Sequence, residues 1–320
     1  MPGLRIGTWN LENLFRPDAG VGAPTDLAAY DAKLAALAGV ATALDVDVLA
    51  VQEVGTPAAL DDLAGLLAAS LGGTWQTEVA AADGRGIRTG VLSRLPVLEV
   101  EQVSVLPPLL GPVTVDDSGE VLDHVGRPAL RVRVDRPGGG FLDVVSVHLK
   151  SKLLSFPGGR FNPRDEDERA RYAVFALHRR AAEAAAVRTF VTALLADQGE
   201  THPLVVGGDL NDEPSAATTQ VLLGPPGSEI GTGGFTRPDQ GDRQRLWNLA
   251  PLIPEAQRFS RVYRGRGELI DHLLVSRAVV GAVTSVTAGG PVPESVGDDP
   301  RARVDKPGSD HRPVVATLAS

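Results

Sequence analysis

Short apolar runs typical of buried strands alternate along the chain with segments of helical periodicity. Strands are predicted at 4–10, 47–54, 88–95, 97–105, 128–134, 141–149, 203–208, 269–275 and 312–318. Helices are predicted at 31–44, 56–71 and 165–195. Such alternation is typical of proteins in which helices cover a sheet. The periodicity therefore predicts an α/β fold, without deciding which one.

The predicted helices carry recognisable start signals and apolar faces. Leu34 and Leu37 stand at helical spacing in the first helix. In the second, the hydroxyl of Thr56 precedes Pro57, a pairing favoured at a helix start. The third opens with the acidic run 165–168, which complements the positive end of the helix dipole.

Loops rich in Gly and Pro separate these elements without dividing the chain. The stretch 107–127, rich in Pro, Gly and Asp, predicts an exposed hairpin or loop. Further loops are expected at 224–244 and 288–309. Because neither a linker nor a long internal repeat is visible, we expect one domain over residues 1–320.

Composition limits the function less than the fold. The chain has no cysteine, which excludes disulfides and thiolate metal sites, and its net charge of −9 argues against a uniformly basic surface. A local basic patch or a metal could still bind phosphate. No segment approaches the roughly 18 consecutive apolar residues of a membrane span, and the first ten residues lack a secretory apolar region. We expect a monomeric cytoplasmic protein without membrane insertion, although a leader removed earlier would leave the same sequence.

Polar residues end or interrupt many of the predicted strands. The set comprises Asn10, Gln52, Glu53, His148, Lys150, Asp209, Asn211, Asp212, Asp271, His272, Asp310 and His311. Ligand sites in α/β proteins gather at strand ends, where the strand fixes the backbone and the loop leaves the side chain accessible. Each residue alone has an ordinary structural explanation, such as a turn-forming Asn or a core His. Their occurrence at so many strand ends favours a site.

Among these strand ends, the cluster "GDLND" at 208–212 gives the strongest indication of a site. Asp209 and Asn211 are two residues apart, so they share a face if the strand continues, and Asp212 then points away. Asp212 is expected to cap the turn that follows.

The motifs in this order resemble the endonuclease/exonuclease/phosphatase superfamily, the DNase-I-like metal-dependent phosphoesterases. They are "TWNLENLF", "VQEV", "VLSRLPV", "VHLKSK", "GDLNDEP", "LIDHLLVS" and "SDHRPVVATL", and they span essentially the whole chain. The details are most similar to a bacterial branch that includes nucleases. The resemblance implies a four-layer α/β/β/α sandwich, in which two packed mixed sheets are flanked by helices.

The resemblance also implies a metal site. Glu53 would be the principal ligand, and Asp310 and Asn10 would complete or orient the site. Oxygen donors without cysteine favour a hard cation, Mg²⁺ first and Mn²⁺ second. Asp209 and Asn211 would lie beside the attacking water and the phosphate.

Histidines would complete the chemistry implied by the resemblance. His311 would pair with Asp271, and His148 would face the leaving group or a phosphate oxygen. Either His311 or Asp209 could be the general base, and the residue types do not distinguish them.

Other neighbours have both structural and functional interpretations. Lys150, Arg88 and Arg127 could reach phosphate, or they could merely solvate a face. His272 is expected to pack structurally. Glu12 and Asn13 in "NLENLF" are expected to tie down a loop.

Three functions fit these features. The first is a Mg²⁺- or Mn²⁺-dependent nuclease that hydrolyses phosphodiester bonds of DNA or RNA. The second is a phosphoesterase for a small or lipid phosphate, sphingomyelinase-like or inositol-phosphatase-like; the apolar "PPLL" in the 107–127 loop supports it only weakly, because the loop has no aromatic residue. The third is an inactive binding scaffold, which the complete set of polar residues disfavours.

Overall fold

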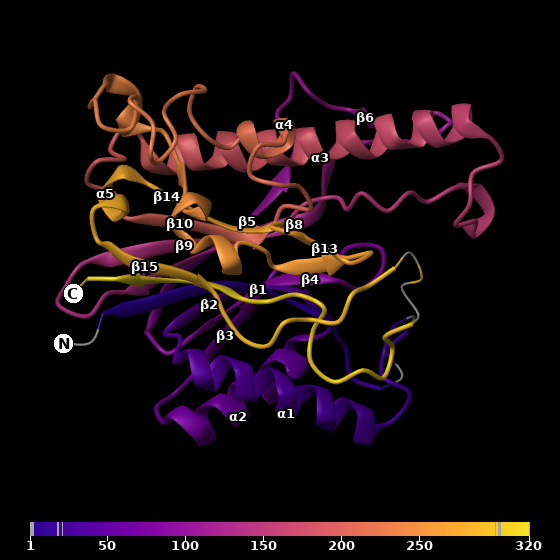
Figure 1. The fold of residues 1–320 in the computed structure, drawn as a ribbon, viewed down its shortest axis with the longest axis horizontal. Helices are drawn as coiled ribbons and strands as arrows, with labels where there is room; N and C mark the ends of the chain where they lie inside the picture. Colours follow the sequence, from indigo (N-terminus) through magenta and orange to yellow (C-terminus); the bar gives the residue numbers. More distant parts are fainter. Residues whose placement is uncertain (1–2, 18, 21, 298, 300–301, 320) are drawn as a thin grey trace.

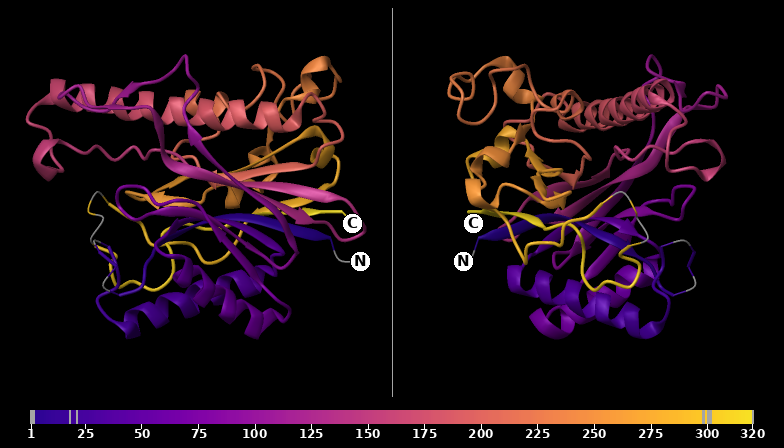
Figure 2. Two further views of the ribbon diagram at one scale, coloured as in Figure 1. Left: turned by 180° about the vertical axis from the view of Figure 1, so that it is seen from behind. Right: turned by 45° about the vertical axis from the view of Figure 1, so that its right-hand side comes forward.

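The protein consists of two six-stranded sheets packed face to face and covered by helices on both outer faces. The computed structural model describes residues 3–17, 19–20, 22–297, 299 and 302–319. Helices α1 and α2 lie against one sheet and α3 lies across the other, and further views show the same layers (Figures 1 and 2). The predicted four-layer α/β/β/α sandwich is therefore confirmed.

The first sheet has the strand order β15-β16-β1-β2-β4-β3. Its strands are β1 (Leu4–Leu14), β2 (Val48–Val54), β3 (Gln76–Val79), β4 (Arg88–Ser93), β15 (Val283–Ala288) and β16 (Val314–Leu318). Only β1 and β2 are parallel, and their register sets Asn10 opposite Gln52. The carboxyl ends of β1 and β2 therefore present neighbouring polar residues on one edge.

The second sheet has the strand order β11-β14-β10-β9-β8-β5. Its strands are β5 (Val97–Val105), β8 (His124–Asp135), β9 (Phe141–His148), β10 (Leu204–Asp209), β11 (Trp247–Asn248) and β14 (Asp271–Val275). Asp209 pairs in register with His148 on one side and with Asp271 on the other. Three of the predicted site residues thus form a row across adjacent strands.

Each long helix begins at a side-chain cap. The helices are α1 (Leu27–Leu44), α2 (Pro57–Leu71) and α3 (Glu166–Leu195), with short helices α4 (Ala217–Gln220) and α5 (Arg277–Val280). Asp26, Thr56 and Asp165 each accept a hydrogen bond from a backbone N–H of the first turn. The first helix begins four residues before its predicted start because Asp26 provides its cap.

Elements outside the strong apolar pattern are the ones that sequence reasoning missed. Strands β3 and β15 both lie at sheet edges and are largely solvent-accessible, so they lack the apolar run expected of a buried strand. The hairpin of β12 (Arg261–Tyr263) and β13 (Arg266–Glu268) was also not predicted, whereas the stretch 107–127, predicted as a hairpin or loop, contains a small hairpin of β6 (Val113–Thr114) and β7 (Val121–Leu122). Residues 298, 300 and 301 of the predicted 288–309 loop lie outside the described residues.

A buried polar link joins the two sheets close to the edge that carries the site. The amide nitrogen of Gln52 donates to Ser146 Oγ across the sheets at 3.2 Å, and Ser146 Oγ donates to the Val51 carbonyl. A Cβ on Gly207 would lie 3.1 Å from Thr8 and from Leu273, so the strands pass too closely there for a larger residue. Gln52, which was predicted as a polar residue at a strand end, is therefore a core residue that fixes how the sheets stack.

Within the described residues, α1 is the only helix long and apolar enough to cross a membrane by length and composition. Its Tyr30, Leu34 and Leu37 are buried in the core with residues of α2 and the first sheet. A helix that packs in this way gives only weak support for a membrane span.

A buried ion cluster stabilises the second sheet away from the site. Asp143 on β9 is fully buried and accepts hydrogen bonds from Arg131, Arg133 and His202 at 2.6–3.0 Å. Burial would raise the pKa of Asp143, but these hydrogen bonds outweigh it and lower the pKa below its ordinary value. The carboxylate therefore contributes stability above that ordinary value and loses it as pH falls through the lowered pKa.

We expect Asp143→Asn to lower the free energy of unfolding by about 3–5 kcal/mol, because it leaves two largely buried guanidinium groups without their shared carboxylate. Urea unfolding at neutral pH measures the loss. Asp135→Asn, which removes an exposed carboxylate at the end of β8, is the matched control. Equal midpoints for the two variants would contradict the stabilising role of the cluster.

Candidate active site

The predicted site residues meet at one edge of the sandwich, at the ends of β1 and β16 that lie away from the chain termini. Asn10, Glu53, His148 and Asp209 come from the carboxyl-terminal parts of β1, β2, β9 and β10. Asp271 opens the antiparallel strand β14, and His311 lies three residues before the start of β16. Both sheets therefore contribute side chains to the same place.

Asp209 lies at the centre of this group and is buried, with 2% of its surface exposed. Its Oδ2 accepts from the Asn10 amide nitrogen at 3.0 Å and lies 3.6 Å from His148 Nε2, and its Oδ1 accepts from the Asn211 backbone N–H. Burial, with the nearby charge of Asp271, raises the pKa of Asp209 to about 6. The carboxylate is thus poised to exchange a proton near neutral pH.

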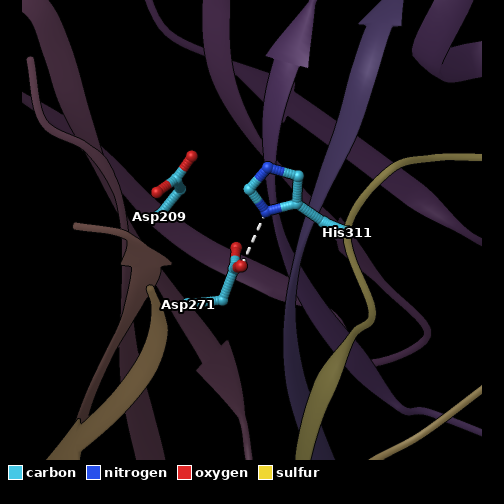
Figure 3. Close-up of side chains that lie close together, drawn as sticks. All are labelled: Asp209, Asp271 and His311. Atoms are coloured by element: carbon cyan, nitrogen blue, oxygen red, sulfur yellow. Dashed lines mark hydrogen bonds and ion pairs between the residues drawn. The ribbon is translucent and has the colours of Figure 1, made fainter. Parts of the chain in front are cut away.

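Asp271 and His311 form a hydrogen-bonded pair beside Asp209 (Figure 3). His311 Nδ1 donates to Asp271 Oδ2 at 2.7 Å, and both side chains are buried. Asp271 is itself held by Ser260, whose Oγ accepts from the Asp271 backbone N–H at 3.1 Å. The predicted pairing is therefore present, and it fixes which imidazole nitrogen carries a proton toward the carboxylate.

The acidic surroundings keep His311 protonated. Burial would lower its pKa, but the charges of Asp271 and Asp310 and the hydrogen bond to Asp271 outweigh burial and raise the pKa to about 10. A doubly protonated imidazole donates from both nitrogens and cannot accept a proton. Near neutral pH, His311 is therefore a cationic donor.

His148 differs from His311 in both charge and partners. It is buried, and burial together with the charges of Arg127 and His311 lowers its pKa well below the ordinary value. Its Nδ1 is buried without a hydrogen-bond partner among the described residues. The ring is therefore neutral near neutral pH, and its Nε2 is the nitrogen that faces Asp209 and Glu53.

Asn211 reaches the site by a different route from the predicted one. Strand β10 ends at Asp209, and Asn211 adopts the left-handed conformation with φ of 54°. Its side chain is buried, and the amide nitrogen donates to the Leu149 carbonyl at 3.1 Å. Asp209 and Asn211 are thus brought together by a tight turn, because the strand does not continue through them.

Glu53 and Asn10 form the second half of the cluster. The Asn10 amide nitrogen donates to Glu53 Oε1 at 3.2 Å as well as to Asp209, while Asn13 N–H donates to Glu53 Oε2. Asn10 turns its oxygen away, to the Glu12 backbone N–H at 2.9 Å. Of the two predicted roles for Asn10, this orientation matches the one that orients the carboxylates.

The segment that carries Asp310 and His311 is fastened to β1 and α1. Glu12 accepts two hydrogen bonds from Arg303, at 2.6 and 3.1 Å, and one from the Asp310 backbone N–H. Lys33, buried on α1, donates to the Gly308 carbonyl at 2.7 Å. The expectation that Glu12 ties down a loop therefore matches its contacts, and the loop is the one that positions the dyad histidine.

Lys33, Arg303 and Arg261 are charged residues at the site that sequence reasoning did not assign. Lys33 could have been noticed, because it falls on the buried stripe of α1 beside Tyr30 and Leu34, where a lysine needs a partner. Arg303 and Arg261 lie in loop-rich or exposed-looking sequence, which carries no comparable signal.

Two sets of donors could hold a divalent cation. One ligand atom each from Asp209, Asp271 and His311 lies within 4.8 Å of the others. In this set His311 Nδ1 and Asp271 Oδ2 are already hydrogen-bonded to each other, so the set fits a cation poorly. The other candidate donors are Glu53 and Asp310, whose hard carboxylate oxygens suit a divalent cation, and the side chain of Glu53 is 21% exposed.

The predicted phosphate-binding cations lie at the rim of the site. Lys150 Nζ donates to the carbonyls of Ser151 and Leu153, and burial lowers its pKa to about 8. Arg88 donates to the carbonyls of Gly55 and Gly86. Both cations are thus partly engaged with backbone.

Arg127 lies on β8, the strand beside β9, which carries His148 at one end of the row of site residues. Its surface is 9% exposed. Its Nε lies 3.4 Å from Asp83 Oδ2. Its charge acts on His148 and on Lys150. Arg127 therefore lies on the His148 side of the site.

Two neighbouring polar residues serve the scaffold. His272 is buried between the Asn248 side chain and the Asp212 carbonyl, in agreement with its expected packing role. The Asp212 carboxylate binds Thr218 at 2.7 Å and Arg180 at 3.1 Å, which joins the turn to α4 and α3.

A two-sheet sandwich with a carboxylate and histidine site at its edge defines a class of phosphoesterase fold. The sequence pattern of the Endonuclease/Exonuclease/phosphatase family matches residues 7–311, so the chain belongs to this family. Members of this family are phosphoesterase hydrolases that generally use divalent metals.

Solved structures share the fold at low sequence identity. An endonuclease/exonuclease/phosphatase from Beutenbergia cavernae is 21% identical, with a TM-score of 0.56 over 100% of this chain and 72% of that one. Truncated Caenorhabditis elegans TDP2 is 16% identical, with 0.57 over 99% and 98%. The mannosyl-6-phosphatase Bt3783 of Bacteroides thetaiotaomicron is 15% identical, with 0.58 over 99% and 100%. None of the curated proteins matches the sequence.

We expect Asp271→Asn to lower the pKa of His311 from about 10 toward its ordinary value of 6.5, because the charge that favours the imidazolium is removed. Histidine NMR titration of the protein in EDTA measures this change, with His311→Gln assigning the resonance. Asp116→Asn, which removes a partly exposed carboxylate from the 107–127 segment, is the control. Equal pKa values of His311 in wild type and in Asp271→Asn would show that the pair does not control the charge of the imidazole.

Proposed function

We propose that the protein is a Mg²⁺- or Mn²⁺-dependent phosphodiesterase, and that its substrate is DNA or RNA. The observation that carries the proposal is the Asp271–His311 pair, 2.7 Å apart, set beside the buried Asp209 at the edge where both sheets end. Family membership supports phosphoester hydrolysis. The choice of a nucleic acid rests on the motif resemblance and on the cations at the rim.

Glu53 and Asp310 would hold the divalent cation, and Asn10 would keep Glu53 and Asp209 in place through its amide. When bound, the cation supplies positive charge to the oxygens of the phosphate group. Both carboxylates carry oxygen donors that suit Mg²⁺ and Mn²⁺. The roles of the remaining residues follow from their protonation.

Asp209 is proposed as the general base. A pKa of about 6 leaves it mostly deprotonated at pH 7 yet close enough to neutrality to accept a proton from water. His311, with a pKa of about 10, is the complementary choice for a donor to a non-bridging phosphate oxygen. This proposal makes Asp209 the base and His311 the donor, a choice that the residue types alone left open.

His148 would face the leaving group. Its ring is neutral, lies 3.6 Å from Asp209, and retains a buried Nδ1 without a partner among the described residues. Arg127, whose charge acts on His148, would face the adjoining part of the substrate. Cations on this side favour a substrate with more than one phosphate, as a nucleic acid strand provides.

A small or lipid phosphate is the second candidate. The mannosyl-6-phosphatase of Bacteroides thetaiotaomicron shares the fold, and Leu109 and Leu110 of the 107–127 segment are 97% and 47% exposed. Exposed apolar residues on one loop suit contact with a lipid interface. The same segment carries Asp116, Asp117 and Glu120, which would oppose an anionic membrane, so we favour the nucleic acid.

We expect the protein to cleave plasmid DNA, single-stranded DNA or RNA with Mg²⁺ or Mn²⁺, and to lose this activity in EDTA until metal is restored. The panel should also contain bis-p-nitrophenyl phosphate, sphingomyelin and mannose 6-phosphate. Hydrolysis of sphingomyelin or mannose 6-phosphate without nucleic acid cleavage would move the proposal to the second candidate. Full activity in the chelated protein would exclude the metal-dependent mechanism.

Glu53→Gln tests the metal site within the same assay. Turnover and Mn²⁺ affinity by calorimetry should each fall by at least the roughly 10–100-fold seen when a partner of a metal ligand is lost. Circular dichroism should show an unchanged fold. Glu213→Gln, at an exposed position, is the matched control and should behave as wild type.

We expect Asp271→Asn and His311→Ala each to lower turnover by roughly 10²–10⁴-fold, because each removes one half of a positioned donor pair. The double variant should lose little more than either single variant, since residues that act as a unit are not additive. Steady-state rates on a diester substrate provide the cycle. Losses that multiply fully would mean that the two residues act separately.

A further inference from the structure

The cations around the carboxylate cluster differ in how many donors they have left for a substrate. Lys33 donates to the Gly308 carbonyl, and Arg303 donates from two of its nitrogens to the carboxylate of Glu12. Lys150 donates to two backbone carbonyls. These three side chains are therefore occupied in holding the protein together.

Arg261 stands apart from them. It opens the β12–β13 hairpin, and its side chain is 26% exposed. Within the described part of the chain its side chain makes one hydrogen bond, from Nε to Asp310 Oδ2 at 3.3 Å. A guanidinium presents five N–H donors, so most of its donors remain available.

The backbone of Arg261 is held firmly against the dyad. Arg261 forms an isolated β-bridge with His311, and the preceding Ser260 accepts from the Arg312 and Asp271 backbone N–H groups through its carbonyl and its hydroxyl, respectively. The guanidinium carbon lies 5.7 Å from the Tyr263 ring centroid, a contact that restricts its direction. The side chain is therefore preorganised at the site.

The electrostatic surroundings place Arg261 among the catalytic carboxylates. Burial would lower its pKa, but the charges of Asp310, Asp209 and Glu268 outweigh burial and raise it above the ordinary value. Arg127 precedes the row of site residues on β8, while Arg261 lies at the other end, beyond Asp271 on β14. The two arginines therefore flank the row from opposite ends.

We propose that Arg261 is a substrate-binding residue whose guanidinium nitrogens donate to a non-bridging oxygen of the phosphate group under attack. The inference rests on the proposed function, because it assumes that a phosphate ester enters between Asp209 and His311. Arginine suits this task because its planar fork matches two phosphate oxygens. An anion that approaches several carboxylates also needs a fixed cation beside them.

The test compares Arg261→Met and Arg261→Lys with Arg266→Met, which removes an exposed arginine from the same hairpin. Calorimetry measures the binding of inorganic phosphate in the presence of Mn²⁺. We expect Arg261→Met to raise the Kd for phosphate by roughly 10–100-fold, the effect of losing charge-assisted hydrogen bonds. Arg261→Lys should recover part of the loss, because it keeps the charge without the fork, and Arg266→Met should bind as wild type.

A titration of Mn²⁺ without phosphate, with thermal unfolding alongside, separates substrate binding from a structural role. Loss of a cation beside Asp310 should leave Mn²⁺ affinity unchanged or tighter, and the Tm should not fall. Unchanged phosphate binding in Arg261→Met, or a weaker Mn²⁺ affinity that accounts for the phosphate loss, would overturn the inference. A wild-type protein that binds phosphate but hydrolyses no phosphate ester would instead contradict the proposed function.

Discussion

The close packing of the two sheets is the constraint on which the site depends. Asn10 on β1 and Asp209 on β10 are 199 residues apart in sequence, yet their side chains are hydrogen-bonded at 3.0 Å. That contact requires the sheets to stack in one position, and the buried Gln52–Ser146 bond and the tightly enclosed Gly207 hold them there. A sliding of one sheet over the other would separate the two halves of the site before it exposed much of the core.

Charge balance is the second constraint. Several carboxylates lie within one small region, and burial makes each uncompensated charge costly. Hydrogen-bonded cations compensate two of these charges: Arg303 donates to Glu12, and His311 donates to Asp271. Burial raises the pKa of Asp209 to about 6, and the neighbouring carboxylates raise that of His311 to about 10, so an acceptor and a donor are separated among neighbouring groups. Stabilisation of the fold and preparation for chemistry thus share the same interactions.

The sequence predicted the long, buried or capped elements well and the edge elements poorly. Strands such as β2 and β10 are continuous apolar runs, and α2 begins at a Thr-Pro signal, so local pattern is enough to place them. Strand β15 has an exposed face and lies at a sheet edge, so its alternation is weak. Which polar strand ends meet could be proposed only through the motif resemblance, because sequence order does not specify strand order in a mixed sheet.

By itself, the sequence determined the residue types at the strand ends, and hence an oxygen-rich site in an α/β protein that belongs to a phosphoesterase family. Only the tertiary structure decided the partners and charges of those residues. Asn211 adopts the left-handed conformation in a turn, the side chain of Gln52 joins the two sheets in the core, and Arg261 is hydrogen-bonded to Asp310. The physical reason is that hydrogen bonds, burial and electrostatic fields depend on distances between chain segments far apart in sequence, which local periodicity does not encode.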